Sequence, residues 1–216
     1  MSRLSPDWSL TVITDSELSL GRPDLVVARA AMAGGATVVQ LRQKRGSTRD
    51  MVALGHALRQ LTSEMGVTFI VNDRLDVALA VGANGVHVGQ DDLPAAAARA
   101  LLGPDRLLGV SAATPDEARA AHAAGADYLG VGAVYATGSK ADAGAPIGLD
   151  GLALVAQATG LPIVAIGGIG PGRAAACIEH GAAGVAVISA IVSQADPEAA
   201  ARRLRIEIDA ARAQSH

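Results

Sequence analysis

Aromatic residues and cysteine are scarce in this chain of 216 residues. Phe, Trp and Tyr together make up 2% of it, whereas hydrophobic residues make up 50%. A buried core must therefore be built mainly from Ala, Val, Leu and Ile. The single cysteine, Cys177, excludes an internal disulfide, fits a reducing compartment and is expected to serve only helix packing.

Strong charge and long apolar runs are also missing. The formal net charge of -3 argues against a general role at nucleic acids or membrane surfaces. The opening stretch MSRLSPDWSLTVITD lacks the apolar segment of a signal peptide, and LPIVAIGGIG is too short and glycine-rich to span a bilayer. We expect a soluble, cytoplasmic protein with no nucleic-acid or membrane partner.

Short β-branched runs alternate with longer Ala-rich helical patterns along the chain. We expect strands at 10–14, 37–42, 67–72, 85–89, 107–110, 127–132, 162–167 and 184–189. Helices are expected at 24–33, 48–65, 74–81, 94–102, 115–124, 149–158, 171–180 and 197–212. Pro94, Pro115, Pro171 and Pro197 stand at or near first-turn positions, where proline is favoured.

A Gly-Ala pair precedes every second expected strand, at Gly35, Gly82, Gly125 and Gly181. Each glycine falls where a helix ends and is expected to adopt the left-handed cap conformation. The repeat indicates eight strand–helix units, which predicts a single TIM barrel, (βα)8, over residues 1–216. A doubly wound open sheet is the alternative, but it poorly accommodates eight regularly repeated parallel strands.

Polar residues gather at the carboxyl ends of the expected strands, where TIM barrels place their active sites. Gln40, Arg42 and Lys44 are spaced by two, so an extended chain projects them to one side. A solvated strand end is the plain alternative for Arg42 and Lys44. Strand five ends at Ser111.

Two neighbouring strands end in carboxylates, in Asn72-Asp73 and in Gln90-Asp91-Asp92. Adjacent strands lie about 5 Å apart, so both acids can reach one hard cation. Mg²⁺ is commonly held by one or two carboxylates together with waters and substrate phosphates. Alternatively, Asp73 caps the third helix, and Asp91 or Asp92 caps the fourth.

Glycine and hydroxyl residues follow the later strands. AIGGIGPGR, which contains Gly167 and Gly168, offers backbone N–H groups and a helix N-terminus just beyond, and VISAI adds a second set. Thr137, Ser139 and Lys140 could wrap another anion, although an ordinary solvated loop is the alternative. His87 lies within strand four and is expected to be a hydrogen-bonded interior residue. No Ser-His-Asp order or Cys/His cluster supports nucleophilic catalysis.

These features together describe one magnesium site, several cations and two anion sites. They predict one substrate with a pyrophosphate group and another with a monophosphate group. Without a poised general base, the protein would act electrostatically by stabilising a departing pyrophosphate.

With these residues in view, the chain resembles the thiamine phosphate synthase family from LTVITD to VAVISAI. The resemblance rests on VVQLRQK, FIVNDRLDVALAVGANGVHVGQDDLP, DYLGVGAVYATGSKADAGAPIGLDGL and IVAIGGI. It implies a transferase that joins 4-amino-2-methyl-5-pyrimidinylmethyl pyrophosphate to a thiazole phosphate and releases pyrophosphate. It also implies a dissociative mechanism, in which pyrophosphate leaves before the thiazole nitrogen attacks.

The resemblance also implies roles for individual residues. Those matching the pyrimidine and pyrophosphate contacts are Gln40, Arg42, Lys44, Asn72, Ser111 and Lys140, of which Arg42, Lys44, Ser111 and Lys140 are the expected catalytic group. Asp73 and Asp92 match the Mg²⁺ ligands. Those matching the thiazole phosphate site are Thr137, Ser139, Gly167, Gly168, Ile188 and Ser189. The chain departs from the family pattern at Ala113, where His is frequent, and at Tyr135-Ala136, where Phe-Pro is more common.

Three other functions are weighed against the synthase. A thiazole tautomerase-like relative would need an acid–base group but no full pyrophosphate site. A non-catalytic phosphate-ligand sensor would not need paired carboxylates. A phosphate-sugar isomerase or epimerase explains the glycine-rich loops but not the expected magnesium and pyrophosphate sites. The sequence leaves open whether the chain forms a homo-oligomer.

Overall fold

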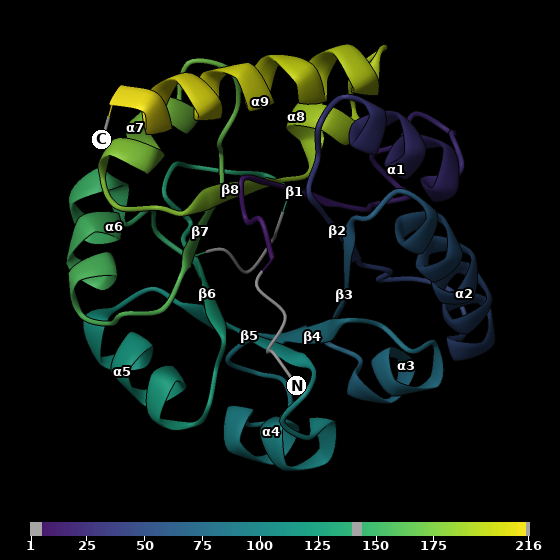
Figure 1. Ribbon diagram of the computed structural model, residues 1–216, viewed down its shortest axis with the longest axis horizontal. Helices are drawn as coiled ribbons and strands as arrows, with labels where there is room; N and C mark the ends of the chain where they lie inside the picture. The colour runs from purple at the N-terminus through teal and green to yellow at the C-terminus, as the bar shows by residue number, and fades with distance from the viewer. Residues whose placement is uncertain (1–5, 140–143, 215–216) are drawn as a thin grey trace.

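A computed structural model describes residues 6–139 and 144–214 of the protein. Eight parallel strands close into a barrel in the order β1-β2-β3-β4-β5-β6-β7-β8, with β8 paired to β1. Figure 1 shows the barrel encircled by its helices. The predicted (βα)8 fold is therefore confirmed, and the open-sheet alternative is wrong.

The strands are short, and each begins and ends within two residues of its predicted limits. They are β1 (Leu10–Ile13), β2 (Val38–Leu41), β3 (Thr68–Asn72), β4 (Gly85–Val88), β5 (Leu107–Ala112), β6 (Tyr128–Val131), β7 (Ile163–Ile166) and β8 (Gly184–Val187). The glycines of all four Gly-Ala pairs adopt the expected left-handed conformation, with φ between 65° and 105°.

Nine helices cover the barrel in the described parts of the chain. They are α1 (Asp24–Ala33), α2 (Thr48–Glu64), α3 (Leu75–Ala80), α4 (Ala95–Leu102), α5 (Pro115–Ala123), α6 (Gly148–Gln157), α7 (Ala174–Glu179), α8 (Ser189–Val192) and α9 (Pro197–Gln214). None of those in residues 6–139 and 144–214 has the length and apolar character needed to cross a membrane.

Two helical predictions need correction. The seventh helix was expected from residue 171 but begins at Ala174, because Gly172 has φ +81° and interrupts the helical path. Pro171 therefore lies before the helix rather than in its first turn. The short helix α8 was not predicted, because four residues carry too little periodicity to read.

Alternating side chains divide the strands into two apolar layers. Val39 and Leu41 of β2 belong to the large cluster between the sheet and the helices, together with Cys177 of α7, whose predicted packing role agrees with this burial. Val38 belongs to a smaller cluster with Ile13, Ile70, Leu107, Tyr128 and Val164, inside the barrel. The barrel is thus a packed core rather than a pore, and ligands must bind where its strands end.

Candidate active site

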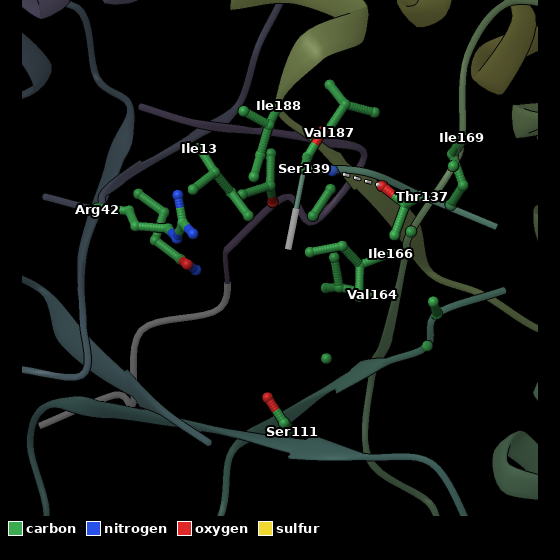
Figure 2. Close-up of a pocket in the computed structure, with 18 of the residues that line it drawn as sticks. Ile13, Arg42, Ser111, Thr137, Ser139, Val164, Ile166, Ile169, Val187 and Ile188 are labelled. Carbon is green, nitrogen blue, oxygen red and sulfur yellow. Dashed lines mark hydrogen bonds between the residues drawn. The ribbon is translucent and has the colours of Figure 1, made fainter. Parts of the chain in front are cut away.

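One large cavity of about 1020 Å³ opens at the carboxyl ends of the strands. Its walls include the predicted site residues Gln40, Arg42, Lys44, Asn72, Asp73, Asp92, Ser111, Thr137, Ser139, Gly167, Gly168, Ile188 and Ser189. Figure 2 shows Arg42, Ser111 and Thr137 on separate parts of this wall. The structure therefore brings together every predicted site residue that it describes. Lys140 lies outside the described residues.

The end of β2 supplies two cations to the cavity. β2 ends at Leu41, yet Arg42 and Lys44 still line the cavity with Gln40. Arg42 is only 9% exposed, and its Nη1 pairs with Asp15 Oδ2 at 2.5 Å. Its backbone N–H also donates to Thr14 Oγ1 at 3.0 Å. Asp15 thus holds a buried guanidinium in place, so a plain solvated strand end does not describe Arg42.

Asp73 sits at the centre of a tight turn after β3. The N–H of Arg74 donates to the Asn72 carbonyl at 2.7 Å, and Asp73 itself has φ +63°. Non-glycine residues with this conformation are uncommon and cluster at functional sites. The Asp73 N–H donates to the His87 carbonyl at 2.8 Å, which fastens the turn to β4. Helix α3 has Arg74 at its N-cap position and no side-chain capping hydrogen bond, so Asp73 is not its N-cap.

Asp92 is held by the end of the neighbouring strand. Its Oδ2 accepts a hydrogen bond from the Gly89 N–H at 2.7 Å, which folds the loop back onto β4. Helix α4 has Pro94 at its N-cap position and no side-chain capping hydrogen bond. The interpretation that Asp91 or Asp92 caps this helix is therefore wrong. Both acids line the cavity instead.

The two carboxylates are of the ligand type that Mg²⁺ accepts. β3 and β4 are paired neighbours, with Asn72 opposite His87, and the loops that follow them carry Asp73 and Asp92. Within the described chain, no group of three or more His, Cys, Asp or Glu side chains forms a self-sufficient metal site. Mg²⁺ differs from most metals in needing only one or two carboxylates when waters and phosphates complete its shell.

Ser111 belongs to a hydrogen-bonded chain inside the barrel. His87 Nε2 lies 3.0 Å from Ser111 Oγ, and His87 Nδ1 lies 3.1 Å from the Tyr128 hydroxyl. Burial first, and the Asp127 charge second, raise the pKa of Tyr128, so its hydroxyl stays protonated. In the tautomer that satisfies all three groups, Tyr128 donates to Nδ1 and Nε2 donates to Ser111. The prediction that His87 is a hydrogen-bonded interior residue is confirmed.

Two glycines on the inner face make room for these rings. A Cβ at Gly109 would overlap the Tyr128 ring, and one at Gly130 would lie 2.7 Å from His87 Cε1. Gly109 and Gly130, which lie inside strands, were therefore a sequence signal for the hydrogen-bonded side chains of His87 and Tyr128. Glycines inside strands often mark a close approach by another group.

The loops that follow β6 and β8 form a second wall of the cavity, which carries a cluster of hydroxyl groups. The Ser139 N–H donates to Thr137 Oγ1 at 3.2 Å (Figure 2), and Ser139 Oγ donates to Ser189 Oγ at 3.3 Å. Ser189 opens helix α8, where backbone N–H groups have no intrahelical partner. Ser189 and Ala190 both line the cavity, so this wall can bind an anion through neutral donors.

The loop after β7 contributes its glycines to the cavity, but not the N-terminus of the helix that follows. Gly167 and Gly168 line the cavity with φ of +98° and +65°, and a Cβ at Gly168 would lie 2.8 Å from Tyr135 Cβ. The N-terminus of α7, however, is already occupied by a carboxylate. Glu207 of α9 accepts hydrogen bonds from the N–H groups of Gly172 and Ala175, both at 2.9 Å. The expectation that this helix N-terminus serves an anion is therefore wrong.

Sequence reasoning assigned no role at the site to four residues that shape the cavity. Asp15 fixes Arg42, and Tyr128 fixes His87. Glu117 accepts a hydrogen bond from the Ala113 N–H at 2.6 Å, and Arg173 brings a further cation to the rim. The roles of Asp15 and Tyr128 emerge only from contacts between residues far apart in the sequence. Glu117 and Arg173 instead bind backbone groups four and five residues away.

Comparison with known proteins is decisive for the family. The model of the family described as thiamine monophosphate synthase matches residues 10–191. The chain belongs to the thiamine monophosphate synthase family. Thiamine-phosphate synthase of Moorella thermoacetica is 58% identical over 207 residues, which cover 96% of this chain and 99% of that protein. The enzyme of the same name from Chloroflexus aurantiacus is 57% identical over 199 residues, covering 92% of each chain.

A solved structure from the same family has the same architecture. Thiamine phosphate pyrophosphorylase from Pyrococcus furiosus superposes with a TM-score of 0.89 at 41% identity, covering 95% of this chain and 98% of that one. These family members match nearly the whole barrel, including the segments that build the cavity. The match supports a synthase. It gives no support to the tautomerase-like relative or to the sensor.

Proposed function

We propose that this protein is a thiamine phosphate synthase. It joins 4-amino-2-methyl-5-pyrimidinylmethyl pyrophosphate to a thiazole phosphate and releases pyrophosphate. The observation that carries this proposal is a single cavity with two different anion-binding walls. One wall presents Arg42 and Lys44 beside the paired carboxylates, and the other presents Thr137, Ser139 and Ser189. A reaction that joins two phosphorylated substrates needs both walls.

The pyrimidine substrate fits the wall formed by β2 to β5. Gln40, Asn72 and Ser111 offer hydrogen-bond donors and acceptors for its ring, while Arg42 and Lys44 face its pyrophosphate. His87 orients the Ser111 hydroxyl through the 3.0 Å contact. Asp15 keeps the Arg42 guanidinium in position before the substrate arrives, so little reorganisation is needed as charge develops.

Asp73 and Asp92 are the residues that would hold Mg²⁺, and the remaining ligands would be waters and pyrophosphate oxygens. Mg²⁺ held there would supply positive charge next to the leaving pyrophosphate. The chain's own contribution is to fix both carboxylates, one by the turn after β3 and the other by the Gly89 N–H.

The thiazole phosphate fits the wall of hydroxyls and amides, with Gly167, Gly168 and Ile188 beside it. Lys140, expected to reach the pyrophosphate, follows Ser139 directly in sequence, and its role stays a prediction. The bond from the pyrimidine methylene carbon to pyrophosphate breaks first, and the thiazole nitrogen then forms the new bond to that carbon. This dissociative route needs no strong base. Both His87 ring nitrogens are engaged by Tyr128 and Ser111, so the histidine is not positioned as one.

The direct test supplies purified protein with both substrates and Mg²⁺ and identifies the product by mass. Thiamine phosphate should form together with pyrophosphate. Arg42→Gln should lose most of this activity. Arg45→Gln is the matched control, because the Arg45 side chain is 84% exposed and pairs with the surface residue Glu17. Equal activity in the two variants would remove Arg42 from the proposed site.

The same assay separates the rival functions. A tautomerase-like protein would convert a thiazole phosphate isomer without consuming the pyrimidine substrate. A sensor would bind one of the substrates and form no product. We also propose that the protein works in the cytoplasm, where the reducing conditions suit its single cysteine. Assembly into a homo-oligomer stays an open prediction.

A further inference from the structure

Among the described residues, Arg173 is a third cation at the cavity, and the proposed function leaves it unused. The described residues that line the cavity include three basic side chains, Arg42, Lys44 and Arg173. The first two follow β2, on the wall assigned to the pyrophosphate. Arg173 comes instead from the loop between β7 and α7, beside the wall assigned to the thiazole phosphate.

The guanidinium of Arg173 is held in a defined place. Its Nη1 donates to the Gly168 carbonyl at 2.8 Å, and its Cζ lies 4.7 Å from the centroid of the Tyr135 ring. Tyr135 is fastened to the same loop, because its N–H donates to the Gly167 carbonyl at 3.0 Å. Arg173 therefore bridges the loops that follow β6 and β7, both of which line the cavity.

The charge of Arg173 is not neutralised by a described neighbour. The nearby carboxylate of Glu207 accepts from the N–H groups of Gly172 and Ala175, and Arg173 forms no ion pair with any residue in 6–139 or 144–214. A guanidinium carries five N–H donors, and the Gly168 carbonyl accepts from only one of its nitrogens. Donors and charge therefore remain for a ligand.

The described side-chain donors of the hydroxyl wall carry no charge to balance that of a phosphate group. A phosphate monoester carries a charge of about −1.5 to −2 at neutral pH. The side-chain donors of Thr137, Ser139 and Ser189 are all neutral, and hydrogen bonds from ionised donors are roughly twice as strong as those between neutral groups. We propose that Arg173 is a substrate-binding residue that supplies the positive charge for the thiazole phosphate group. This inference rests on the proposed function and adds the group that selects the phosphorylated thiazole.

The test compares the phosphorylated thiazole with its alcohol, which lacks the phosphate. In Arg173→Gln, the KM for thiazole phosphate should rise by roughly tenfold to a hundredfold, the range expected for a lost charged hydrogen bond. The inhibition constant of the alcohol and the KM for the pyrimidine substrate should stay within about twofold of their values in the unaltered protein, because neither measurement involves the thiazole phosphate group. The KM of Arg173→Lys for thiazole phosphate should lie between that of the unaltered protein and that of Arg173→Gln. Lysine keeps the positive charge but lacks the planar guanidinium.

Arg203→Gln is the matched control, because Arg203 is an exposed arginine of α9 outside the cavity. It should leave both constants unchanged. If Arg173→Gln weakens the phosphorylated thiazole and the alcohol by the same factor, Arg173 only positions the loops and the inference is wrong. An unchanged KM for thiazole phosphate also overturns it.

Failure of the proposed function can be told apart from failure of this inference. If the unaltered protein forms no product, binding of inorganic phosphate is measured instead by equilibrium dialysis. Weaker phosphate binding by Arg173→Gln than by Arg203→Gln then still supports an anion site at Arg173. Equal binding by both variants, or no binding by the unaltered protein, overturns it.

Discussion

At the residue scale, the account depends most on Asp73 and Asp92 acting as one metal site. Asp73→Asn and Asp92→Asn should each lower turnover by about 10²-fold or more, as expected when a group that stabilises developing charge is lost. The double variant should lose much less than the product of the two single losses, because groups that act as a unit are non-additive. Turnover is measured for all three variants across a magnesium titration.

Each outcome of this titration has a distinct reading. Excess Mg²⁺ should partly restore either single variant but not the double variant. Full activity of Asp73→Asn or Asp92→Asn at low magnesium would rule out a shared site. Asp105→Asn is a suitable control, since Asp105 is an exposed acid that does not line the cavity.

Individual cavity residues could be predicted where strand geometry alone brings them to the carboxyl end of the barrel. Gln40 and Arg42 were found because a spacing of two puts side chains on one face, and Asp73 because it ends a strand. Tyr128 and Arg173 were not found, because their roles depend on His87 and Tyr135, which belong to other elements. A side chain's partner across a barrel cannot be read from local sequence.

At the element scale, the turn after β3 combines an unusual backbone with a predicted ligand. Asp73 has φ +63°, a conformation that costs roughly 1 kcal/mol for a residue with a Cβ and little for glycine. Asp73→Gly should therefore be more stable than Asp73→Ala by about 1 kcal/mol, although both should be inactive. Denaturant unfolding and the product assay test this pair together.

A glycine variant no more stable than the alanine variant would show that the turn relaxes when the carboxylate is removed. Activity in either variant would separate the turn's conformation from the metal site. Asn is the residue that best tolerates the left-handed conformation after glycine, so Asp73→Asn isolates the carboxylate's charge.

The elements themselves were mostly predictable, and the errors have physical causes. The β-branched runs located all eight strands, and the Gly-Ala helix ends agree with them before four of these strands. The start of α7 was missed because Gly172 adopts φ +81° and Glu207 caps the helix from α9. The fourth helix was given an acidic cap, but Asp92 folds back to the Gly89 N–H instead.

At the scale of the whole molecule, one buried acid makes stability depend on pH. Asp24 is 8% exposed, and its Oδ1 has no hydrogen-bond partner among the described residues. Burial first, and the Asp15 charge second, raise the pKa of Asp24 above the ordinary 3.8. The folded protein thus binds this proton more tightly than the unfolded chain. The free energy of unfolding therefore falls as pH rises from 3.8 through the raised pKa.

Asp24→Asn should remove this penalty and stabilise the protein at neutral pH by on the order of 1 kcal/mol. Loss of an acid from the first turn of α1 opposes the gain, but that effect is only about 0.3–1 kcal/mol, against roughly 1–3 for an unsatisfied buried group. Urea unfolding as a function of pH checks the sign. The advantage should vanish below pH 3.8, and an advantage that persists there would refute the titration of Asp24 as its cause.

The central claim is that the two proposed anion-binding walls share one cavity, so that the two substrates react there together. Coupling between the substrates is the most direct test: pyrophosphate release is followed in a single turnover with and without thiazole phosphate. The account predicts that release reaches its full rate only with both substrates and yields one thiamine phosphate for each pyrophosphate. Full-rate release from the pyrimidine substrate alone would contradict it.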